Sequence, residues 1–159
     1  MTATAPTRPL RQDAQRNRDR IVDAARAAFV ADGIEVGVEQ IAKLAGVGVG
    51  TVYRRFPTKE ALVDAVVAEQ YEEFARVARE ALERAEPWEG LREFLERSMA
   101  LQASNRAFKE AAGARVASGE LAAARARVTA LVRLLVERAQ ASGDLRPDLA
   151  VEDVAVLFW

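Results

Sequence analysis

Apolar residues recur every three or four positions along almost the whole chain, and no segment keeps the period of two expected of a half-buried strand. This pattern predicts an all-α protein. The first helix is expected to begin near Asn17, a good N-cap residue, and to end at Asp32, because Gly33 can adopt the left-handed conformation that closes a helix. Residues 1–15 are then expected to form a flexible basic arm.

Two short helices are expected next, at residues 38–45 and 49–56, joined by the turn Gly46-Val47-Gly48. The turn needs Gly46 because glycine tolerates a left-handed backbone. Thr58 is the predicted N-cap of a long amphipathic helix that runs to about Ala85.

The second half of the chain keeps the helical spacing. Pro87 fits the first turn of a helix that ends near Ala103, and a short helix is expected around Phe108. Two more helices are expected, at residues 121–139 and from residue 152 onward. The last helix runs into the apolar end VAVLFW, which is typical of a chain that continues further or needs a partner surface.

The stretch IAKLAGVGVGTVYRRF predicts a helix-turn-helix, in which the second helix enters the major groove of DNA while the first braces it. The residues expected to pack the bracing helix and the angle between the helices are Ile41, Ala42, Leu44, Ala45, Val47 and Val52. The residues left facing outward are Thr51, Tyr53, Arg54 and Arg55. Their hydroxyl and guanidinium groups suit phosphates and guanine edges, although paired arginines also occur on ordinary solvated helices.

Composition excludes several kinds of chemistry. Cysteine and histidine are both absent, which removes disulfides, the usual zinc sites and imidazole catalysis. The carboxylates lie among arginines at helix-surface spacing, and no phosphate loop or nucleophile–base pair occurs, so no enzyme, metal or cofactor is expected. Without a signal peptide or an apolar run of about 20 residues, we expect a cytoplasmic protein that does not enter a membrane.

Charge is unevenly distributed. Residues 1–59 hold ten Lys and Arg against six Asp and Glu, whereas the remainder holds thirteen against eighteen. A basic N-terminal end is compatible with a phosphate-backbone partner.

The order IVDAARAAFVADG, IAKLAGVGVGTVYRRF and PTKEAL resembles the TetR family of bacterial transcriptional regulators over about residues 17–62. The resemblance implies a DNA-binding domain at residues 16–58 and a helical ligand-binding and dimerisation domain at residues 59–159. It also implies phosphate contacts by hydroxyl groups and lysine, and phosphate or base contacts by arginine. The DNA-binding residues it implies are Gly48, Val49, Thr51, Tyr53, Arg54, Arg55 and Lys59.

Three positions depart from the family pattern. Gly37 and Gly48 stand where side-chain caps are usual, and Val49 stands where a basic or polar residue is common. Glycine is a tolerable N-cap, and Val49 could meet a thymine methyl group.

The same resemblance implies a homodimeric repressor on a near-palindromic operator in double-stranded DNA, released by a small apolar or amphipathic ligand. Candidate ligand contacts, which could equally be plain core, are Phe74, Trp88, Phe94, Met99, Phe108 and Trp159. One alternative is a ligand-independent DNA-binding protein of this fold that acts through a protein partner. Another is a helical interaction module or enzyme in which the arginines only maintain solubility.

Overall fold

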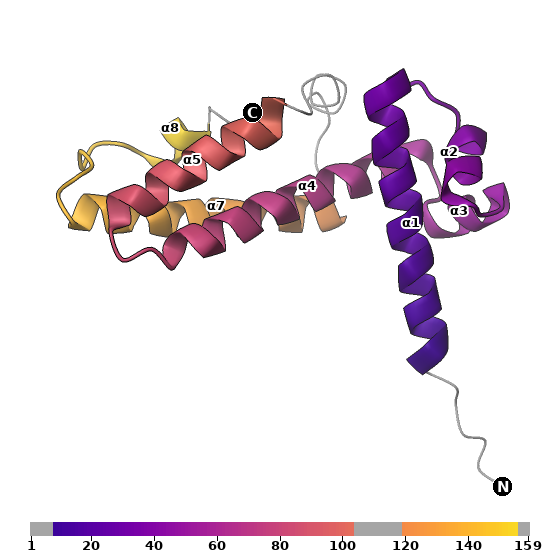
Figure 1. The fold of residues 1–159 in the computed structure, drawn as a ribbon, viewed down its shortest axis with the longest axis horizontal. Coiled ribbons are helices and arrows are strands. Elements are labelled where there is room, and N and C mark those ends of the chain that lie inside the picture. Colours follow the sequence, from indigo (N-terminus) through magenta and orange to yellow (C-terminus); the bar gives the residue numbers. More distant parts are fainter. Residues whose placement is uncertain (1–7, 104–118, 156–159) are drawn as a thin grey trace, which may run out of the picture. The chain divides into compact units, whose positions relative to one another are not determined.

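The computed structural model describes residues 8–103 and 119–155, and within these ranges it contains helices and no strand. The all-α prediction is therefore confirmed. In chain order the helices are α1 (Arg8–Asp32), α2 (Val38–Ala45), α3 (Val49–Arg55), α4 (Lys59–Leu82), α5 (Pro87–Ala103), α7 (Gly119–Ala141) and α8 (Val151–Ala155) (Figure 1). The helix predicted around Phe108 and the final residues through Trp159 lie outside the described ranges.

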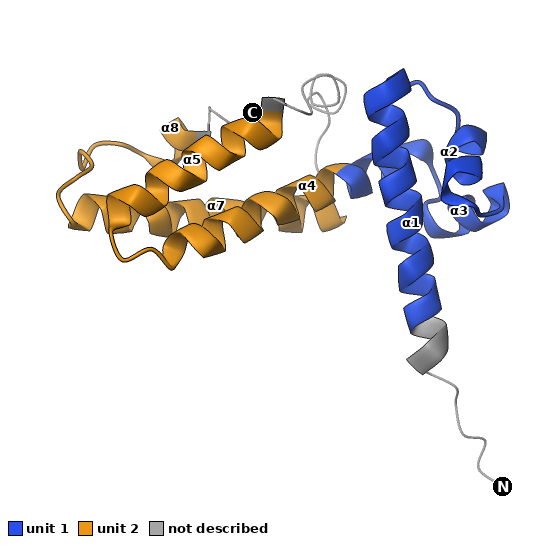
Figure 2. Cartoon of the chain, in the orientation of Figure 1, with its two compact units in different colours: residues 1–66 blue, residues 67–159 orange. Residues whose placement is uncertain are grey.

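The chain divides into two compact units, residues 1–66 and 67–159 (Figure 2). The division falls inside α4, so residues 59–66 of that helix belong to the first unit. The boundary expected from the sequence, between residues 58 and 59, coincides instead with the start of α4.

Helix α1 begins at Arg8 rather than near Asn17, so residues 8–15 are helical and the predicted flexible arm is wrong for them. Side-chain pairs about one turn apart support this part of the helix. Gln15 donates a hydrogen bond of 2.7 Å to Asp19, and Arg16 pairs with Asp13. These pairs are polar, and a search for an apolar stripe therefore misses them.

The core of the first unit is built from α1, α2, α3 and the start of α4. Its buried side chains include Ile21, Val22, Phe29, Ile41, Val52, Phe56 and Leu62. Burying each of the large ones stabilises the unit by roughly 1.5–3 kcal/mol relative to exposure. Helix α1 ends as expected, since Gly33 has a φ of 81° and its N–H donates to the Phe29 carbonyl over 3.1 Å.

Leu44 does not pack the bracing helix, contrary to the sequence prediction. Helix α2 has the predicted bounds, and its buried residues are Val38, Ile41, Ala42 and Ala45. These follow the i, i+3, i+4, i+7 spacing of one helical face. Leu44 falls outside that face and is 58% exposed.

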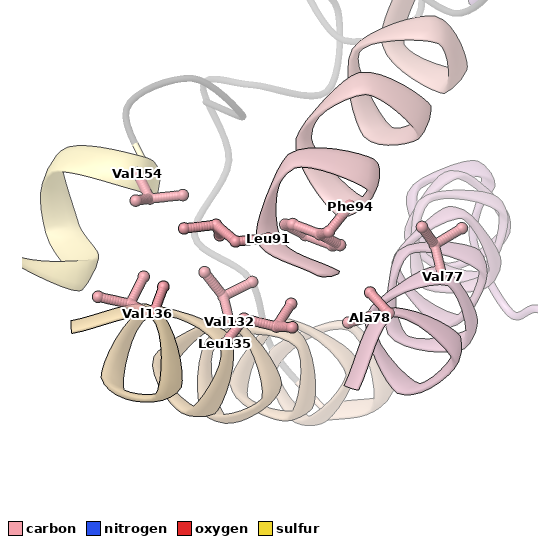
Figure 3. Close-up of a cluster of buried hydrophobic side chains, with 10 residues drawn as sticks. Val77, Ala78, Leu91, Phe94, Val132, Leu135, Val136 and Val154 are labelled. Carbon is pink, nitrogen blue, oxygen red and sulfur yellow. The ribbon is translucent and has the colours of Figure 1, made fainter. Parts of the chain in front are cut away.

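The second unit packs α4, α5, α7 and α8 around one apolar cluster (Figure 3). Ala78 and Ala81 come from α4, Leu91 and Phe94 from α5, and Leu135 from α7. Arg138 of α7 donates hydrogen bonds to the carbonyls of Leu82 and Arg84, the latter over 3.1 Å. These bonds satisfy carbonyls at the end of α4, which stops at Leu82 rather than near Ala85.

The start of α4 and the whole of α5 follow the sequence prediction. The Ala61 N–H donates to the Thr58 side-chain oxygen over 3.1 Å, so Thr58 is the N-cap of α4. Helix α5 runs from Pro87 to Ala103 as predicted.

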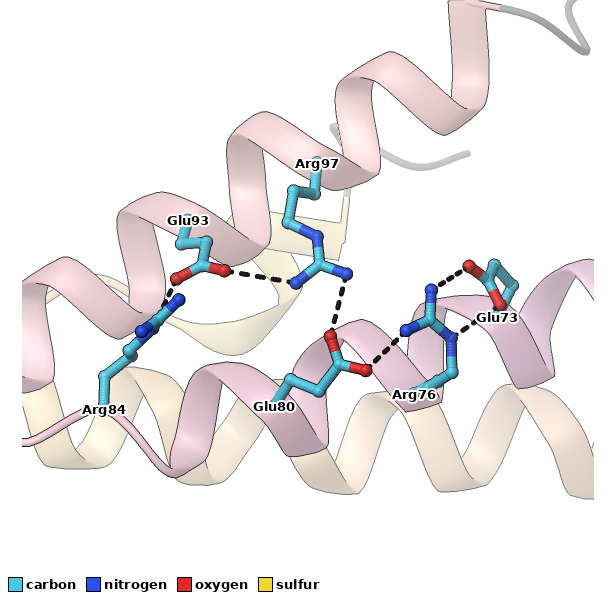
Figure 4. A network of polar contacts seen from close by, with 6 residues as sticks. All are labelled: Glu73, Arg76, Glu80, Arg84, Glu93 and Arg97. Atoms are coloured by element: carbon cyan, nitrogen blue, oxygen red, sulfur yellow. Dashed lines mark hydrogen bonds and ion pairs between the residues drawn. The ribbon is translucent and has the colours of Figure 1, made fainter.

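A row of alternating charges joins α4 to α5 (Figure 4). Arg84 contacts Glu93 at 2.6 Å, and Arg97 contacts Glu93 at 3.1 Å and Glu80 at 2.8 Å. Arg76 extends the row by pairing with Glu80 and with Glu73. We call these six residues the charge ladder.

Acid should weaken the second unit through this ladder. Hydrogen bonds from Arg97 and Arg84 are the main causes that hold the pKa of Glu80 and Glu93, respectively, below the ordinary value of 4.5. A folded-state pKa below the unfolded one gives stability that is present above pH 4.5 and is lost as pH falls through the folded-state value.

We therefore expect the Tm of an E80Q/E93Q double variant to fall less steeply below pH 4.5 than that of the parent. Circular dichroism melts between pH 7 and pH 3 measure this difference. The matched control is E89Q, because Glu89 pairs with Arg92 within α5 alone. Parallel pH curves for the parent and the double variant would contradict the prediction.

Candidate nucleic-acid interface

The turn between α2 and α3 is fixed by the backbone of Gly46. This residue has φ 64° and ψ 37°, the left-handed conformation that glycine adopts without strain. Its N–H donates to the Lys43 carbonyl over 3.1 Å, and the Val47 N–H donates to the Ala42 carbonyl over 3.0 Å. The two bonds form a Schellman motif, which ends α2 and sets the direction in which α3 starts.

Arg20 holds this turn against α1. Its Nη2 atom donates a hydrogen bond of 2.7 Å to the carbonyl of Ala45, the last residue of α2. A cation is favourable at this end of a helix, where carbonyl groups lack partners. A Cβ atom added to Gly46 would lie 2.8 Å from the same Nη2 atom, so a side chain there would displace the guanidinium group from the Ala45 carbonyl. No local pattern in the sequence indicates this contact.

Helix α3 starts without a side-chain cap. Gly48 is the N-cap residue in an extended conformation, and its carbonyl accepts from the Thr51 N–H over 2.8 Å. Gly37 plays the same part for α2, again without a side-chain hydrogen bond. Both departures from the family pattern are thus accommodated by backbone geometry alone.

The outer face of α3 carries the predicted DNA-binding residues. Val52 is buried and anchors the helix, whereas Tyr53 is 45% exposed and both Arg54 and Arg55 are exposed. Thr51 and Val49 are half-buried. Among the residues that the structure describes, neither arginine has a hydrogen bond or an ion pair within the protein.

The first turn of α3 presents mostly bare backbone. Gly48 and Gly50 are exposed, and a Cβ atom added at Gly50 would meet nothing within 4 Å. Val49 is therefore the only side chain of this turn ahead of Thr51. Lys59, half-buried, is the first residue of α4, just after the buried Phe56 and the exposed Pro57. The open space at Gly50 could not be recognised from the sequence.

The side chains predicted to contact a ligand differ from one another in burial. Phe74 and Phe94 are buried in the second unit, while Trp88 is 39% exposed and Met99 is 59% exposed. Phe108 lies outside the described residues. A surface depression of about 320 Å³ between α4 and α5 contains none of these side chains. Its lining residues are Glu73, Arg76, Val77, Arg97, Ala100 and Leu101.

The described residues provide neither a metal site nor a membrane span. They contain no group of three or more His, Cys, Asp or Glu side chains placed to hold a metal ion. None of their helices has both the length and the apolar character required to cross a bilayer.

The fold and the exposed face of α3 define a helix-turn-helix protein, and comparisons with known proteins specify the family. Residues 21–66 match the model of bacterial regulatory proteins of the tetR family, and residues 86–159 match the C-terminal domain of SbtR-like transcriptional regulators. A TetR transcription regulatory protein from Mycobacterium vanbaalenii is 36% identical, with a TM-score of 0.74 over 94% of this chain and 92% of that one.

Two other similarities are also to transcriptional regulators. A TetR transcriptional regulator from Streptomyces coelicolor is 32% identical, with a TM-score of 0.62 over 87% of this chain and 81% of that one. HTH-type transcriptional regulators of Staphylococcus aureus are 43% identical over 54 residues, 33% of this chain, and the match spans only 29% of their length. The chain belongs to the TetR family of transcriptional regulators.

Proposed function

We propose that the protein is a transcriptional repressor that binds a near-palindromic DNA operator as a homodimer and is released by a small-molecule ligand. The observation that carries the DNA role is the pair Arg54 and Arg55 on α3. Both guanidinium groups are exposed and make no bond within the described protein. Such groups are available for phosphate oxygens and guanine edges.

The other proposed DNA contacts follow from the positions of residues on α3 and at the start of α4. Thr51 and Tyr53 offer hydroxyl donors to phosphate oxygens on either side of the groove. Lys59 adds a positive charge at the N-terminus of α4, where backbone N–H groups also favour an anion. Val49 offers only apolar contact, which suits a thymine methyl group.

We propose dimerisation because α3, the helix proposed to contact the DNA bases, is short. Helix α3 has seven residues, so it is roughly 10 Å long and can reach only a few base pairs. Two copies related by a two-fold axis would read half-sites about one helical turn of DNA, roughly 34 Å, apart. Such an arrangement provides the affinity and selectivity that one short helix lacks.

Ligand release is proposed from the course of α4. This helix begins at Lys59 and supplies Ala78 and Ala81 to the core of the second unit. A small apolar or amphipathic ligand in that unit would shift the population of conformers only by binding one of them more tightly. A regulator of the same fold, FadR from Bacillus subtilis, has been solved in complex with stearoyl-CoA; it is 23% identical, with a TM-score of 0.69.

Selection of bound duplexes from a random pool with the complete protein tests the proposal. We expect a two-fold symmetric consensus, followed by loss of affinity for that operator when a bound ligand is present. No enrichment would overturn the DNA role, and an enriched site without symmetry would overturn the dimer. Unchanged operator affinity with ligands shown to bind would overturn the release mechanism.

A further inference from the structure

Nothing in the described part of the chain explains why residue 50, the second residue of α3, is a glycine. Gly50 is helical and lacks the positive φ that is adopted by Gly33, Gly46, Gly119 and Gly143. Its backbone is exposed, and a Cβ atom added to it would meet nothing within 4 Å. Alanine would therefore fit without strain and would favour the helix more than glycine does.

The other described glycines without a positive φ differ from Gly50 because the fold accounts for each of them. A Cβ atom on Gly90 would lie 2.5 Å from the Ala81 carbonyl oxygen, so there is no room for one. Gly37 and Gly48 are the N-caps of α2 and α3, positions at which glycine is well tolerated. Glycine inside a helix is destabilising, and one use that offsets this cost is the close approach of the backbone to a binding partner. Gly50 is therefore a candidate for contact with a partner outside the chain.

Gly50 lies on the same side of α3 as residues proposed to hold DNA. At about 100° per residue it lies about 200° around the helix from Val52, which is buried and anchors α3. Residues three and four positions apart are neighbours on a helix surface, so Gly50 is one turn ahead of Tyr53 and Arg54, both of which are exposed. The exposed face of α3 thus has long side chains toward its end and bare backbone at its start.

We propose that Gly50 is a direct DNA contact, at which a base edge in the major groove packs against the bare backbone of α3. In helix-turn-helix proteins the N-terminal residues of the recognition helix contact base edges. Glycine at this position removes the side chain that would hold the helix away from the floor of the groove. The inference rests on the proposed DNA-binding function and adds a contact residue that acts by lacking a side chain.

The G50A variant tests this contact, because it adds one carbon without changing the charge. We expect its affinity for the selected operator to fall by roughly a hundredfold, about tenfold for each half-site of a two-fold dimer, as for one lost base contact per half-site. Its affinity for a random duplex of the same length should stay the same, because non-specific binding depends on the phosphate charges. Fluorescence anisotropy with the two duplexes at one salt concentration measures the difference.

Stability measurements separate a DNA contact from a structural role. Alanine at this helical position should raise the urea midpoint of the free protein, so unfolding cannot be the cause of weaker operator binding. The G50L variant has a good helix former and more bulk at the same position, and it should lose more operator affinity than G50A. The matched control is A130L, since Ala130 is exposed on α7 in the second unit. Its larger side chain should leave operator affinity unchanged.

Each contrary outcome has a distinct meaning. If G50A binds the operator as tightly as the parent does, the inference is overturned and the proposed repressor function stays intact. An equal loss of affinity for the operator and for the random duplex would also overturn it, because the loss would then not concern base edges. A lower urea midpoint for G50A would assign the glycine to the fold instead of to DNA. A parent protein that selects no operator would overturn the proposed function, and this inference with it.

Discussion

Replacing Arg54 and Arg55 together by alanine is expected to weaken operator binding by roughly two orders of magnitude at 0.15 M salt. A hydrogen bond to a charged group contributes about 1.5–3 kcal/mol, so losing one such bond from each half of a two-fold dimer, at the lower value, removes about 3 kcal/mol, or roughly two orders of magnitude. The dependence of log affinity on log salt should also become shallower, by about 0.9 for each phosphate contact removed. Fluorescence anisotropy with the selected operator, from 50 to 300 mM salt, measures both quantities.

The fold should tolerate this change. Both arginines are exposed, and neither makes a hydrogen bond or ion pair with the described part of the chain. Helix α3 is held from its other side, where Val52 and Phe56 are buried. The Tm of the double variant should therefore stay within about 1–2 °C of the parent, as is usual for exposed sites.

A matched control removes the same charge from elsewhere. Arg79 on α4 and Arg133 on α7 are exposed, and among the described residues neither forms an ion pair. Their double alanine variant has the same net charge as R54A/R55A. If both double variants lose equal affinity and slope, the attraction is a property of overall charge, and α3 is not the reading helix.

Helix ends were predictable where a single residue determines them. Helices α2 and α5 have the expected bounds because Gly46 alone can take the closing conformation of α2 and Pro87 fits only the first turn of α5. The start of α1 was not predictable in this way. Between Arg8 and Gly33 the only glycine or proline is Pro9, which lies in the first turn of α1. The weak N-cap preference of Asn17 was therefore not enough to make the helix begin there.

The candidate interface was predictable for a similar reason. In a short helix bounded by Gly48 and Pro57, burying Val52 turns Tyr53, Arg54 and Arg55 toward solvent by helical geometry alone. Contacts between distant segments have no such local pattern. The bond from Arg20 to Ala45 and the charge ladder between α4 and α5 depend on how helices pack, and the buried hydroxyl of Ser98 looks like any surface serine in the sequence.

Gly90 marks a close approach of α5 to α4 in the second unit. It is buried in the first turn of α5, and a Cβ atom placed on it would lie 2.5 Å from the carbonyl oxygen of Ala81 on α4. That oxygen belongs to the backbone, so it cannot rotate away as a flexible side chain could. An alanine at this position must therefore push α5 away from α4.

The movement would disturb the core that both helices share. Leu91 and Phe94 on α5 pack with Ala78 and Ala81 on α4 in the same apolar cluster. Forcing an extra carbon into such packing costs about 1–3 kcal/mol, and the roughly 1 kcal/mol gained from the helix preference of alanine offsets only part of a backbone clash. We expect the G90A variant to lose about 2 kcal/mol of unfolding free energy.

Urea denaturation followed by circular dichroism measures this loss, and G50A is its matched control. Gly50 is also helical, but nothing lies within 4 Å of its added Cβ atom. The same glycine-to-alanine change there should stabilise the protein by about 0.5–1 kcal/mol, because only the unfolded chain loses conformational freedom. The two variants should thus shift the urea midpoint in opposite directions. A G90A midpoint at or above that of the parent would mean that α5 does not approach α4 closely at this turn, and the steric basis for a glycine there would be lost.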